Sequence, residues 1–399
     1  NIDLSIFLSL SRNIAEEMMY WPNIHSCSGL SYYLVKRLFM NKIKIFGMGL
    51  AALALASCST PQKPAVDTAK PVEPVSSAKR PVFDAAAESV ASSGFNENVN
   101  VQQFIQYEVK NRHFSAEELR NFFNDVVYKG NIITIMYRPS TSRPWYEFRT
   151  GNSGAAKFNG GRQFYAANRA VIDDVARKYG VPAELIVAIL GIETNYGKNT
   201  GSFRVADALS TLAFDYPRRA EFFQNELSEL LLMAKEEKEN IFDFKGSYAG
   251  AMGMPQFMPS SYRKWAVDYD GDGHRDIWNN VGDVAASVAN YMKQHGWQTG
   301  GKMVVPVSLT ITPHLQAIID EKTALTRTVA DFKALGVVPQ AAVADNEKAV
   351  LYALETSPGV FEYYLGLNNF YTVWQYNHSR MYVTAVRDIA NAINNNNGL

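Results

Sequence analysis

An almost unbroken apolar stretch that ends in a carboxyl group is the first candidate for chemistry. The stretch is LIVAILGIETNYG, residues 185–197, and its carboxyl group belongs to Glu193. On a helix that begins near Pro182 and is capped near Gly197, Glu193 shares a face with residues three, four and seven positions earlier. These residues are all apolar: Leu190, Ile189 and Ile186. Burial raises the pKa of a carboxyl group, and a carboxyl group that keeps its proton at neutral pH can serve as a general acid. The alternative is a structural Glu, paired with an Arg or capping a neighbouring helix.

A second stretch, GSYAGAMGMPQFMPSSY at residues 246–262, combines small, polar and aromatic side chains. Its glycines permit close approach of backbones. Ser247 and Gln256 offer hydrogen bonds, and three aromatic rings offer stacking surfaces. On composition alone it is a tight Gly/Pro-broken connection between helices, for which a packing role is an equal alternative.

Four segments in the same order carry a resemblance to a known family. IETNYG and GAMGMPQFMPSSY, together with FDYPRRA (214–220) and YNHSRMY (376–382), resemble the lytic transglycosylases of glycoside hydrolase family 103. The resemblance covers roughly residues 99–395 and implies a mainly α, lysozyme-like helical core. It also implies a peptidoglycan substrate, cleaved at the β-1,4 bond between N-acetylmuramic acid and N-acetylglucosamine. Water is not added, because the C6 hydroxyl of the muramic residue closes on its own C1 and leaves a 1,6-anhydro end.

The resemblance also assigns roles to individual residues. Glu193 is implied as the single catalytic residue, acid first and base second, and no cofactor is needed for the chemistry. The implied substrate-binding residues are Ser247, Gln256, Tyr291, Tyr376, Asn377 and Tyr382, with Arg218 and Arg219 facing the anionic lactyl group or stem peptide. The tyrosines could instead be core residues, and the Arg pair a solvated first turn of a helix. A hydrolase normally needs two carboxylates, and after the Gly-rich stretch the next one is Asp268, which belongs to another motif.

That motif is an Asp-rich loop, DYDGDGHRDIWN, at residues 268–279. Acidic residues at loop positions 1, 3, 5 and 9 and a Gly at position 6 follow the spacing of an EF-hand. Position 12 is Asn279, which cannot give the usual bidentate contact, and an acidic residue a few positions later completes the similar site of the family. The predicted ligands of a structural Ca²⁺ are Asp268, Asp270, Asp272, the backbone carbonyl of His274, and Asp283, which lies one residue further along than expected. The alternative is an Asp/Gly turn without metal.

The N-terminal region is typical of a processed, lipid-anchored protein. Residues 40–57 combine a basic start with an apolar segment, 45–56, that is too short to span a bilayer comfortably. They end in Leu-Ala-Ser before Cys58, which resembles a bacterial lipobox, and Ser59 after it resembles outer-membrane sorting. We therefore expect a signal peptide at 40–57, lipidation of Cys58 and a flexible tether over 58–98 that is rich in Pro, Ala and Ser. An ordinary cleaved signal with a chance Cys is the alternative, and residues 1–39 have no assigned role.

The elements that must position these residues are mainly helical. Helical spacing or capping marks residues 99–111, 115–127, 162–179, 182–195, 204–214, 218–238, 281–296 and 381–394. Residues 303–312 alternate like a strand, which predicts a small α/β subdomain near 300–375. Hydrophobic residues make up 47% of the 399-residue chain and its formal net charge is zero, which favours a globular protein and gives no sign of nucleic-acid binding. Both cysteines, Cys27 and Cys58, precede the predicted folded region, which therefore contains no disulfide.

Three functions remain open from the sequence. The first is a periplasmic lytic transglycosylase, anchored by lipid to the outer membrane, with glycan strands as its partner and other cell-wall enzymes as candidate partners. The second is a muramidase that adds water, and the third is a non-catalytic peptidoglycan-binding scaffold lipoprotein. A calcium sensor is disfavoured by Asn279 and by the presence of a single loop.

Overall fold

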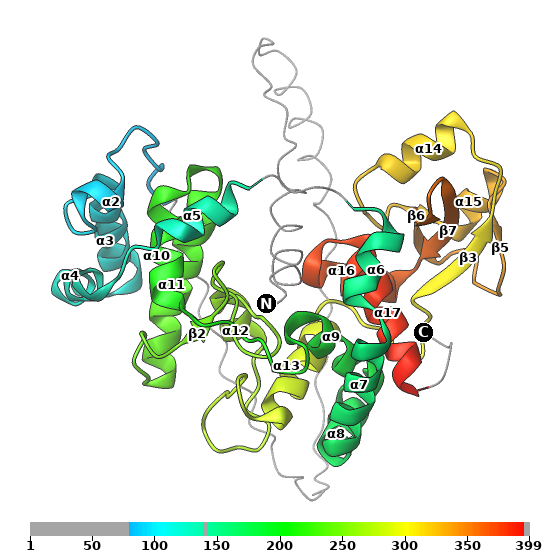
Figure 1. The fold of residues 1–399 in the computed structure, drawn as a ribbon, viewed down its shortest axis with the longest axis horizontal. Helices are drawn as coiled ribbons and strands as arrows, with labels where there is room; N and C mark the ends of the chain where they lie inside the picture. The colour runs from blue at the N-terminus through cyan, green and yellow to red at the C-terminus, as the bar shows by residue number, and fades with distance from the viewer. Residues whose placement is uncertain (1–79, 139–142, 395–399) are drawn as a thin grey trace, which may run out of the picture. The chain divides into compact units, whose positions relative to one another are not determined.

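The computed structural model describes residues 80–138 and 143–394 (Figure 1). The predicted signal peptide, Cys58 and the first part of the predicted tether lie outside the described residues. No helix in the described ranges is both long enough and apolar enough to cross a bilayer.

Helices dominate the fold, as the sequence predicts. Their bounds are α2 Val90–Ser93, α3 Val99–Arg112, α4 Ala116–Asp125, α5 Gly130–Met136, α6 Trp145–Asn152, α7 Ala155–Ala167, α8 Arg169–Tyr179, α9 Ala183–Thr194, α10 Val205–Asp215, α11 Ala220–Glu237, α12 Pro259–Trp265, α13 Val281–Gln294, α14 Pro313–Asp320, α15 Val329–Ala334, α16 Asn368–Asn377 and α17 Arg380–Asn394, with a 3₁₀ turn at Pro217–Arg219.

One predicted helix is in fact two. The segment 162–179 is divided at Asn168, which has non-helical backbone angles (φ −122°, ψ 20°) and whose side-chain amide donates to the Phe164 carbonyl at 2.9 Å. A side chain that bonds nearby backbone competes with helix continuation. The first part, α7, also begins earlier than predicted, at Ala155.

The predicted α/β subdomain is present. Its antiparallel sheet has the strand order β4-β6-β7-β3-β5, and the strands are β3 Val304–Ser308, β4 Arg327–Thr328, β5 Val338–Pro339, β6 Lys348–Ser357 and β7 Val360–Gly366. The strand predicted over 303–312 ends at Ser308, and Thr312 instead caps α14 by accepting a bond from the Leu315 N–H. The sheet and α14–α15 share a hydrophobic core of their own. A further two-stranded ribbon pairs β1 Phe203–Arg204 with β2 Lys245–Gly246.

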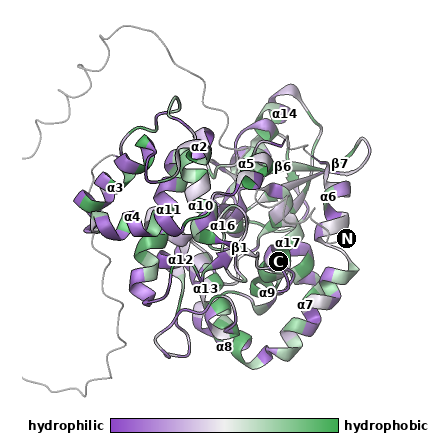
Figure 2. Cartoon of the chain, turned by 60° about the vertical axis from the view of Figure 1, so that its left-hand side comes forward, coloured by the Kyte–Doolittle hydropathy of each residue, from purple (hydrophilic) through white to green (hydrophobic). Residues whose placement is uncertain are grey.

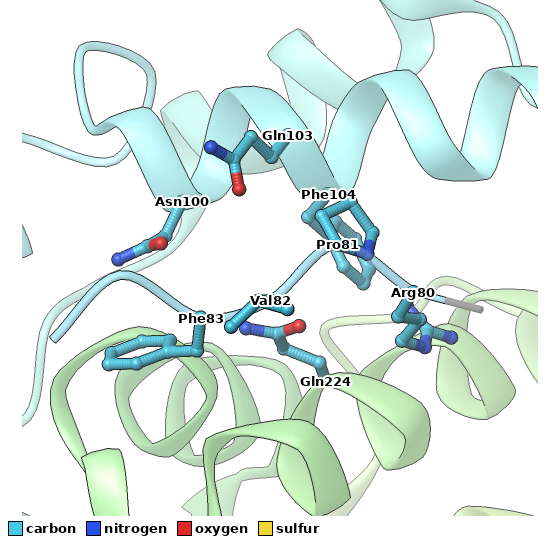
Figure 3. A pocket seen from close by; sticks show the side chains of 8 residues that line it. All are labelled: Arg80, Pro81, Val82, Phe83, Asn100, Gln103, Phe104 and Gln224. Atoms are coloured by element: carbon cyan, nitrogen blue, oxygen red, sulfur yellow. The ribbon is translucent and has the colours of Figure 1, made fainter.

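The last part of the predicted tether, residues 80–98, is folded against the helical body. Val90 and Phe95 are buried in the main core, and Arg80 donates to Glu108 of α3 at 2.8 Å, where both side chains are almost fully buried. Figure 3 shows segment 80–83 lying between α3, which supplies Phe104, and α11, which supplies Gln224. The tether boundary at residue 98 is therefore wrong. The segment is rich in Ala and Ser, and the composition did not indicate that Val90 and Phe95 are buried in the core.

Helix α9 is the centre of the helical core. It packs against α7, α8, α13 and α17, and every residue from Leu185 to Thr194 is buried. A helix that is hydrophobic on all sides must be covered on all sides. Helix α8 differs, since it carries both hydrophilic and hydrophobic residues (Figure 2) and buries Ile172 and Val175 while its charged residues remain outside. The chain therefore encloses one particular helix, and Glu193 lies in its last turn.

Candidate active site

Glu193 occupies the buried face of α9, as predicted. The residues that share this face, Ile186, Ile189 and Leu190, are fully buried, and Glu193 itself is 7% exposed. The helix ends differently from the prediction. Asn195, with φ 53° and ψ 49°, is the C-cap in place of Gly197, and Tyr196 follows at φ 62°. Two consecutive non-glycine residues in the left-handed region make a sharp exit directly after the carboxyl group.

The immediate partner of Glu193 is a tyrosine from the last helix. The hydroxyl of Tyr382, on α17, donates to Oε1 of Glu193 at 2.7 Å, and no hydrogen bond to the second carboxyl oxygen is found among residues 80–138 and 143–394. Burial raises the pKa of Glu193 to about 8, although the Tyr382 hydrogen bond and the Lys157 charge act in the opposite direction. At neutral pH the protonated form therefore predominates. This is the state that a general acid needs.

A cavity of about 180 Å³ lies beside the carboxyl group. Its lining residues are Gly151, Ala156, Lys157, Glu193, Thr194, Asn195 and Asn199. Four of the five polar lining residues belong to the last turn of α9 or to the segment directly after it, and the fifth is Lys157 of α7. A ligand in this cavity would meet Glu193 together with amide and ammonium donors.

The Gly-rich stretch is fixed against the same end of α9. The Thr194 hydroxyl donates to the Met254 carbonyl at 3.0 Å. The side-chain amide of Gln256 donates to the carbonyls of Thr200, at 3.1 Å, and Gly253, at 2.9 Å. Ser247 is buried, and its hydroxyl accepts from the Ala251 N–H at 3.0 Å. Ser247 and Gln256 therefore shape this connection through their own hydrogen bonds.

Gly253 shows why this stretch contains small residues. Its φ is 65°, and a Cβ atom at this position would lie 2.5 Å from the Ile277 carbonyl oxygen. A larger residue would push the stretch away from the last part of the Asp-rich loop, where Ile277 lies. The structure thus shows the close backbone approach that the composition predicts.

The three predicted tyrosines come from three helices and form one cluster, which contacts Glu193 through Tyr382. The rings of Tyr376 and Tyr382 are parallel within 8° at 6.3 Å, and Tyr291 meets Tyr376 edge-on at 4.8 Å. Tyr376 donates to the Pro255 carbonyl at 2.6 Å, which connects α16 to the Gly-rich stretch. Tyr382 is fully buried. It orients Glu193 and offers no open face for stacking.

Asn377 and the Arg pair have different environments. Asn377 is 3% exposed, and its Oδ1 has no hydrogen-bond partner among the described residues. Arg218 lies over the Tyr137 ring at 4.9 Å and Arg219 over the Phe222 ring at 4.0 Å. The structure thus places both guanidinium groups on aromatic faces, and burial lowers the pKa of Arg219.

Three of the predicted calcium ligands converge. Carboxylate oxygens of Asp268, Asp270 and Asp283 lie within 4.8 Å of one another. Asp283 reaches the loop because α13 begins at Val281 and places it in the first turn. The side chain of Asp272 is not part of this group and accepts a bond from the His274 N–H at 2.8 Å. Oxygen donors of this kind suit a hard cation such as Ca²⁺.

Lys157 is a site residue that the sequence analysis missed. It is 6% exposed, lies on α7 and lines the cavity of Glu193. It falls in the first half of α7, outside the predicted helix 162–179, and no motif marks it. The apolar sequence of α9 was the available signal, because a helix that is buried on all sides needs a neighbouring segment to cover each face.

Comparison with known proteins agrees with this geometry. Residues 96–391 match the family described as Transglycosylase SLT domain. The membrane-bound lytic murein transglycosylase B of Escherichia coli K12 is 37% identical over 309 residues, which are 75% of this chain and 84% of that protein. The soluble lytic transglycosylase SltB1 of Pseudomonas aeruginosa is 40% identical, with a TM-score of 0.69 over 73% of this chain and 97% of that one.

A third relative is the lytic transglycosylase Slt35 of Escherichia coli, solved in complex with calcium. It is 35% identical and has a TM-score of 0.67 over 76% of this chain and 95% of that one. The comparisons thereby confirm two predictions from the sequence: the mainly helical, lysozyme-like fold and the resemblance to lytic transglycosylases. The chain belongs to the SLT family and is a lytic murein transglycosylase.

Proposed function

We propose that Glu193 alone performs the proton transfers of a non-hydrolytic cleavage between N-acetylmuramic acid and N-acetylglucosamine. The observation that carries this proposal is a buried carboxyl group at the edge of a cavity, held by Tyr382 on one oxygen, and its burial raises its pKa to about 8. Within the described residues, the groups that shift the pKa of Glu193 are Tyr382 and Lys157, and no second carboxylate is among them. A hydrolase that activates water would need such a group.

The proposed reaction balances without water. Glu193 gives its proton to the glycosidic oxygen as the bond from that oxygen to C1 of the muramic residue breaks. The resulting Glu193 carboxylate then takes the proton of the C6 hydroxyl as O6 forms a bond to C1. The products are a free 4-hydroxyl on the leaving sugar and a 1,6-anhydro end, and Glu193 recovers its proton. An internal nucleophile that is already held near C1 removes the need to bind and orient water.

The surrounding residues suit a sugar ligand. The side-chain oxygen Oδ1 of Asn377 lacks a hydrogen-bond partner among the described residues, and it would accept a hydrogen bond from a sugar hydroxyl or amide. Gln256, Ser247, Tyr291 and Tyr376 hold the walls of the site, and Arg218 and Arg219 would meet the anionic lactyl or peptide group. A further relative, SltB3 of Pseudomonas aeruginosa, is 28% identical with a TM-score of 0.63 and was solved with NAG-anhNAM-pentapeptide, which supports an anhydro product here.

The Asp-rich loop is proposed to hold a structural Ca²⁺. Asp268, Asp270 and Asp283 would supply the side-chain oxygens, with Asp272 and the His274 carbonyl as further candidates. The calcium complex of a relative supports this assignment. The ion would connect the loop to the first turn of α13 and so fix the exit of the Gly-rich stretch, without taking part in the chemistry.

The chain is further proposed to be a periplasmic lipoprotein, anchored through Cys58 and directed by Ser59 to the outer membrane. The name of the membrane-bound relative supports an anchor. Cell fractionation tests this proposal: the wild type should be found in the outer-membrane fraction, and Cys58→Ala should be lost from that fraction. A Cys58→Ala protein that is still found in the outer-membrane fraction would contradict it.

The function is tested by mass spectrometry of muropeptides released from purified peptidoglycan by the wild type and by Glu193→Gln. Anhydro-ended products from the wild type alone are expected. Reducing ends would indicate the water-adding muramidase. Binding without release by either folded protein would indicate the non-catalytic scaffold.

A further inference from the structure

Lys157 places a positive charge inside the active-site cavity. Its side chain is almost fully buried and lines the same cavity as Glu193. Its Nζ donates to the Gly191 carbonyl at 2.5 Å, and Gly191 precedes Glu193 by two residues in α9. A buried ammonium group is costly unless it is hydrogen-bonded and paired with an opposite charge. The Gly191 carbonyl supplies the hydrogen bond, and the ionisable carboxyl group of Glu193 lies in the same cavity.

The position of Lys157 is built by close contact between α7 and α9. The Tyr196 hydroxyl donates to the Lys157 carbonyl at 2.5 Å. A Cβ atom at Gly191 would lie 2.6 Å from the Tyr196 ring, and one at Gly160 would lie 2.7 Å from it. The glycines thus leave room for the ring, and the ring fixes the backbone that carries Lys157. The ammonium group is therefore held in one place by α7, α9 and the turn after α9.

The electrostatic surroundings of Glu193 disfavour a carboxylate. Glu193 lies in the last turn of α9, at the negative end of the helix dipole, and it is desolvated. The titratable groups that face it are Tyr382 on α17, Tyr376 on α16 and Lys157 on α7. Lys157 in turn is faced by Glu193 and by Lys198, which is exposed. Among the described residues that shift the pKa of Glu193, Lys157 is the one cation, and its charge acts against the rise that burial causes.

We propose that Lys157 is a positioning residue that holds a fixed positive charge beside Glu193 and stabilises the carboxylate formed when Glu193 gives its proton to the leaving sugar. The inference rests on the proposed catalytic role of Glu193. The two side chains share a cavity without a direct ion pair among those within 4.0 Å, so Glu193 keeps its proton at rest and gains the stabilisation as charge develops. Electrostatic groups that are fixed in advance act in this way on transition states.

The pKa values of the two groups agree with this arrangement. Burial lowers the pKa of Lys157 to about 8, and the charge of Glu193 opposes that shift. Burial likewise raises the pKa of Glu193 to about 8, against the charge of Lys157. Each group therefore favours the ionised form of the other, and proton transfer out of Glu193 is eased by the presence of the ammonium.

The test compares Lys157→Met, Lys157→Gln and Lys157→Arg with the wild type in the pH profile of muropeptide release. Lys157→Gln keeps a donor for the Gly191 carbonyl and removes the charge, whereas Lys157→Arg keeps the charge. We expect the alkaline limb to move up by about 1 pH unit in the Met and Gln variants, with a rate loss of about tenfold at the optimum. The Arg variant should retain the wild-type limb. Lys198→Met is the matched control, because it removes an exposed charge close by in the sequence, and its limb should not move.

The pKa of Glu193 is measured directly by ¹³C NMR of the side-chain carboxyl carbon, assigned with Glu193→Gln. It should rise in the two uncharged variants. Unchanged limbs and an unchanged carboxyl pKa in folded Lys157→Gln would overturn the proposal, and this variant decides if Lys157→Met does not fold. Full activity of Glu193→Gln would remove the catalytic role on which the inference rests. That failure is distinguishable, because the NMR titration of the Lys157 variants does not depend on activity.

Discussion

The hydrogen bond from Tyr382 to Glu193 makes the most specific prediction about the site. In Tyr382→Phe the ring stays in its fully buried position, and the hydroxyl that donates to Glu193 Oε1 at 2.7 Å is lost. That bond favours the carboxylate over the protonated acid, since it lowers the pKa of Glu193. Removal of the hydroxyl therefore makes Glu193 a weaker acid and leaves its Oε1 without this hydrogen bond.

The magnitude follows from the strength of a hydrogen bond to a charged group, which contributes about 1.5–3 kcal/mol. Because one pKa unit corresponds to 1.36 kcal/mol, the pKa of Glu193 should rise by about 1–2 units. The alkaline limb of the activity profile should move upward by the same amount. The rate at the optimum should fall by about 10-fold to 100-fold, because the same stabilisation is lost as the proton leaves Glu193.

The assay is the rate of muropeptide release from purified peptidoglycan as a function of pH. Tyr376→Phe is the matched control for the position of the limb, because its hydroxyl donates to the Pro255 carbonyl and not to a carboxyl group. An alkaline limb that stays in place in folded Tyr382→Phe, or that moves equally in Tyr376→Phe, would refute the reasoning.

Three further predictions concern stability. Between the usual carboxyl pKa of 4.5 and about 8, native Glu193 keeps a proton that the unfolded chain releases. Stability of the wild type therefore falls as pH rises through this window, and Glu193→Gln should gain a few kcal/mol over the wild type between pH 5 and pH 8 in urea unfolding; a constant difference would contradict the assignment. Gly191→Ala should destabilise the protein by about 1–3 kcal/mol, despite the higher helix propensity of Ala, because its Cβ would lie 2.6 Å from the Tyr196 ring; a raised Tm would show that the ring can move. Saturating Ca²⁺ should raise the Tm by about 2–4 °C, and EDTA should reverse the rise. In Asp270→Asn the rise in Tm with Ca²⁺ should be smaller. Equal Tm values with Ca²⁺ and with EDTA would argue against the site.

The sequence predicts the centre of this site well because local patterns determine it. The apolar run before Glu193 has no polar face, so the helix must be enclosed and its one late carboxyl group desolvated. The Gly-rich stretch and the Asp-rich loop are equally local, since both depend on residue types within one turn or loop. The sequence offers Asp283 as a ligand one residue further along than expected, and its approach to Asp268 and Asp270 depends on where α13 begins.

The features that escaped prediction depend on contacts between distant segments. Tyr382 and its hydrogen-bond partner Glu193 are 189 positions apart in the chain. Nothing in the local sequence distinguishes Tyr382 from a tyrosine that stacks on a ligand. Lys157 lies on α7 but before residue 162, where the predicted helix begins, and its contact with the Gly191 carbonyl joins two different helices. Residues 80–98 have a composition typical of a tether, yet Arg80 forms an ion pair with Glu108 of α3.

The central claim is that one carboxyl group and an internal hydroxyl cleave the glycan without water. The most direct measurement is digestion of purified peptidoglycan in H₂¹⁸O, followed by mass spectrometry of the released ends. The account predicts 1,6-anhydro ends with no ¹⁸O at C1, and no release by Glu193→Gln. Incorporation of one ¹⁸O at C1 of the primary product would contradict it, because water would then be the nucleophile.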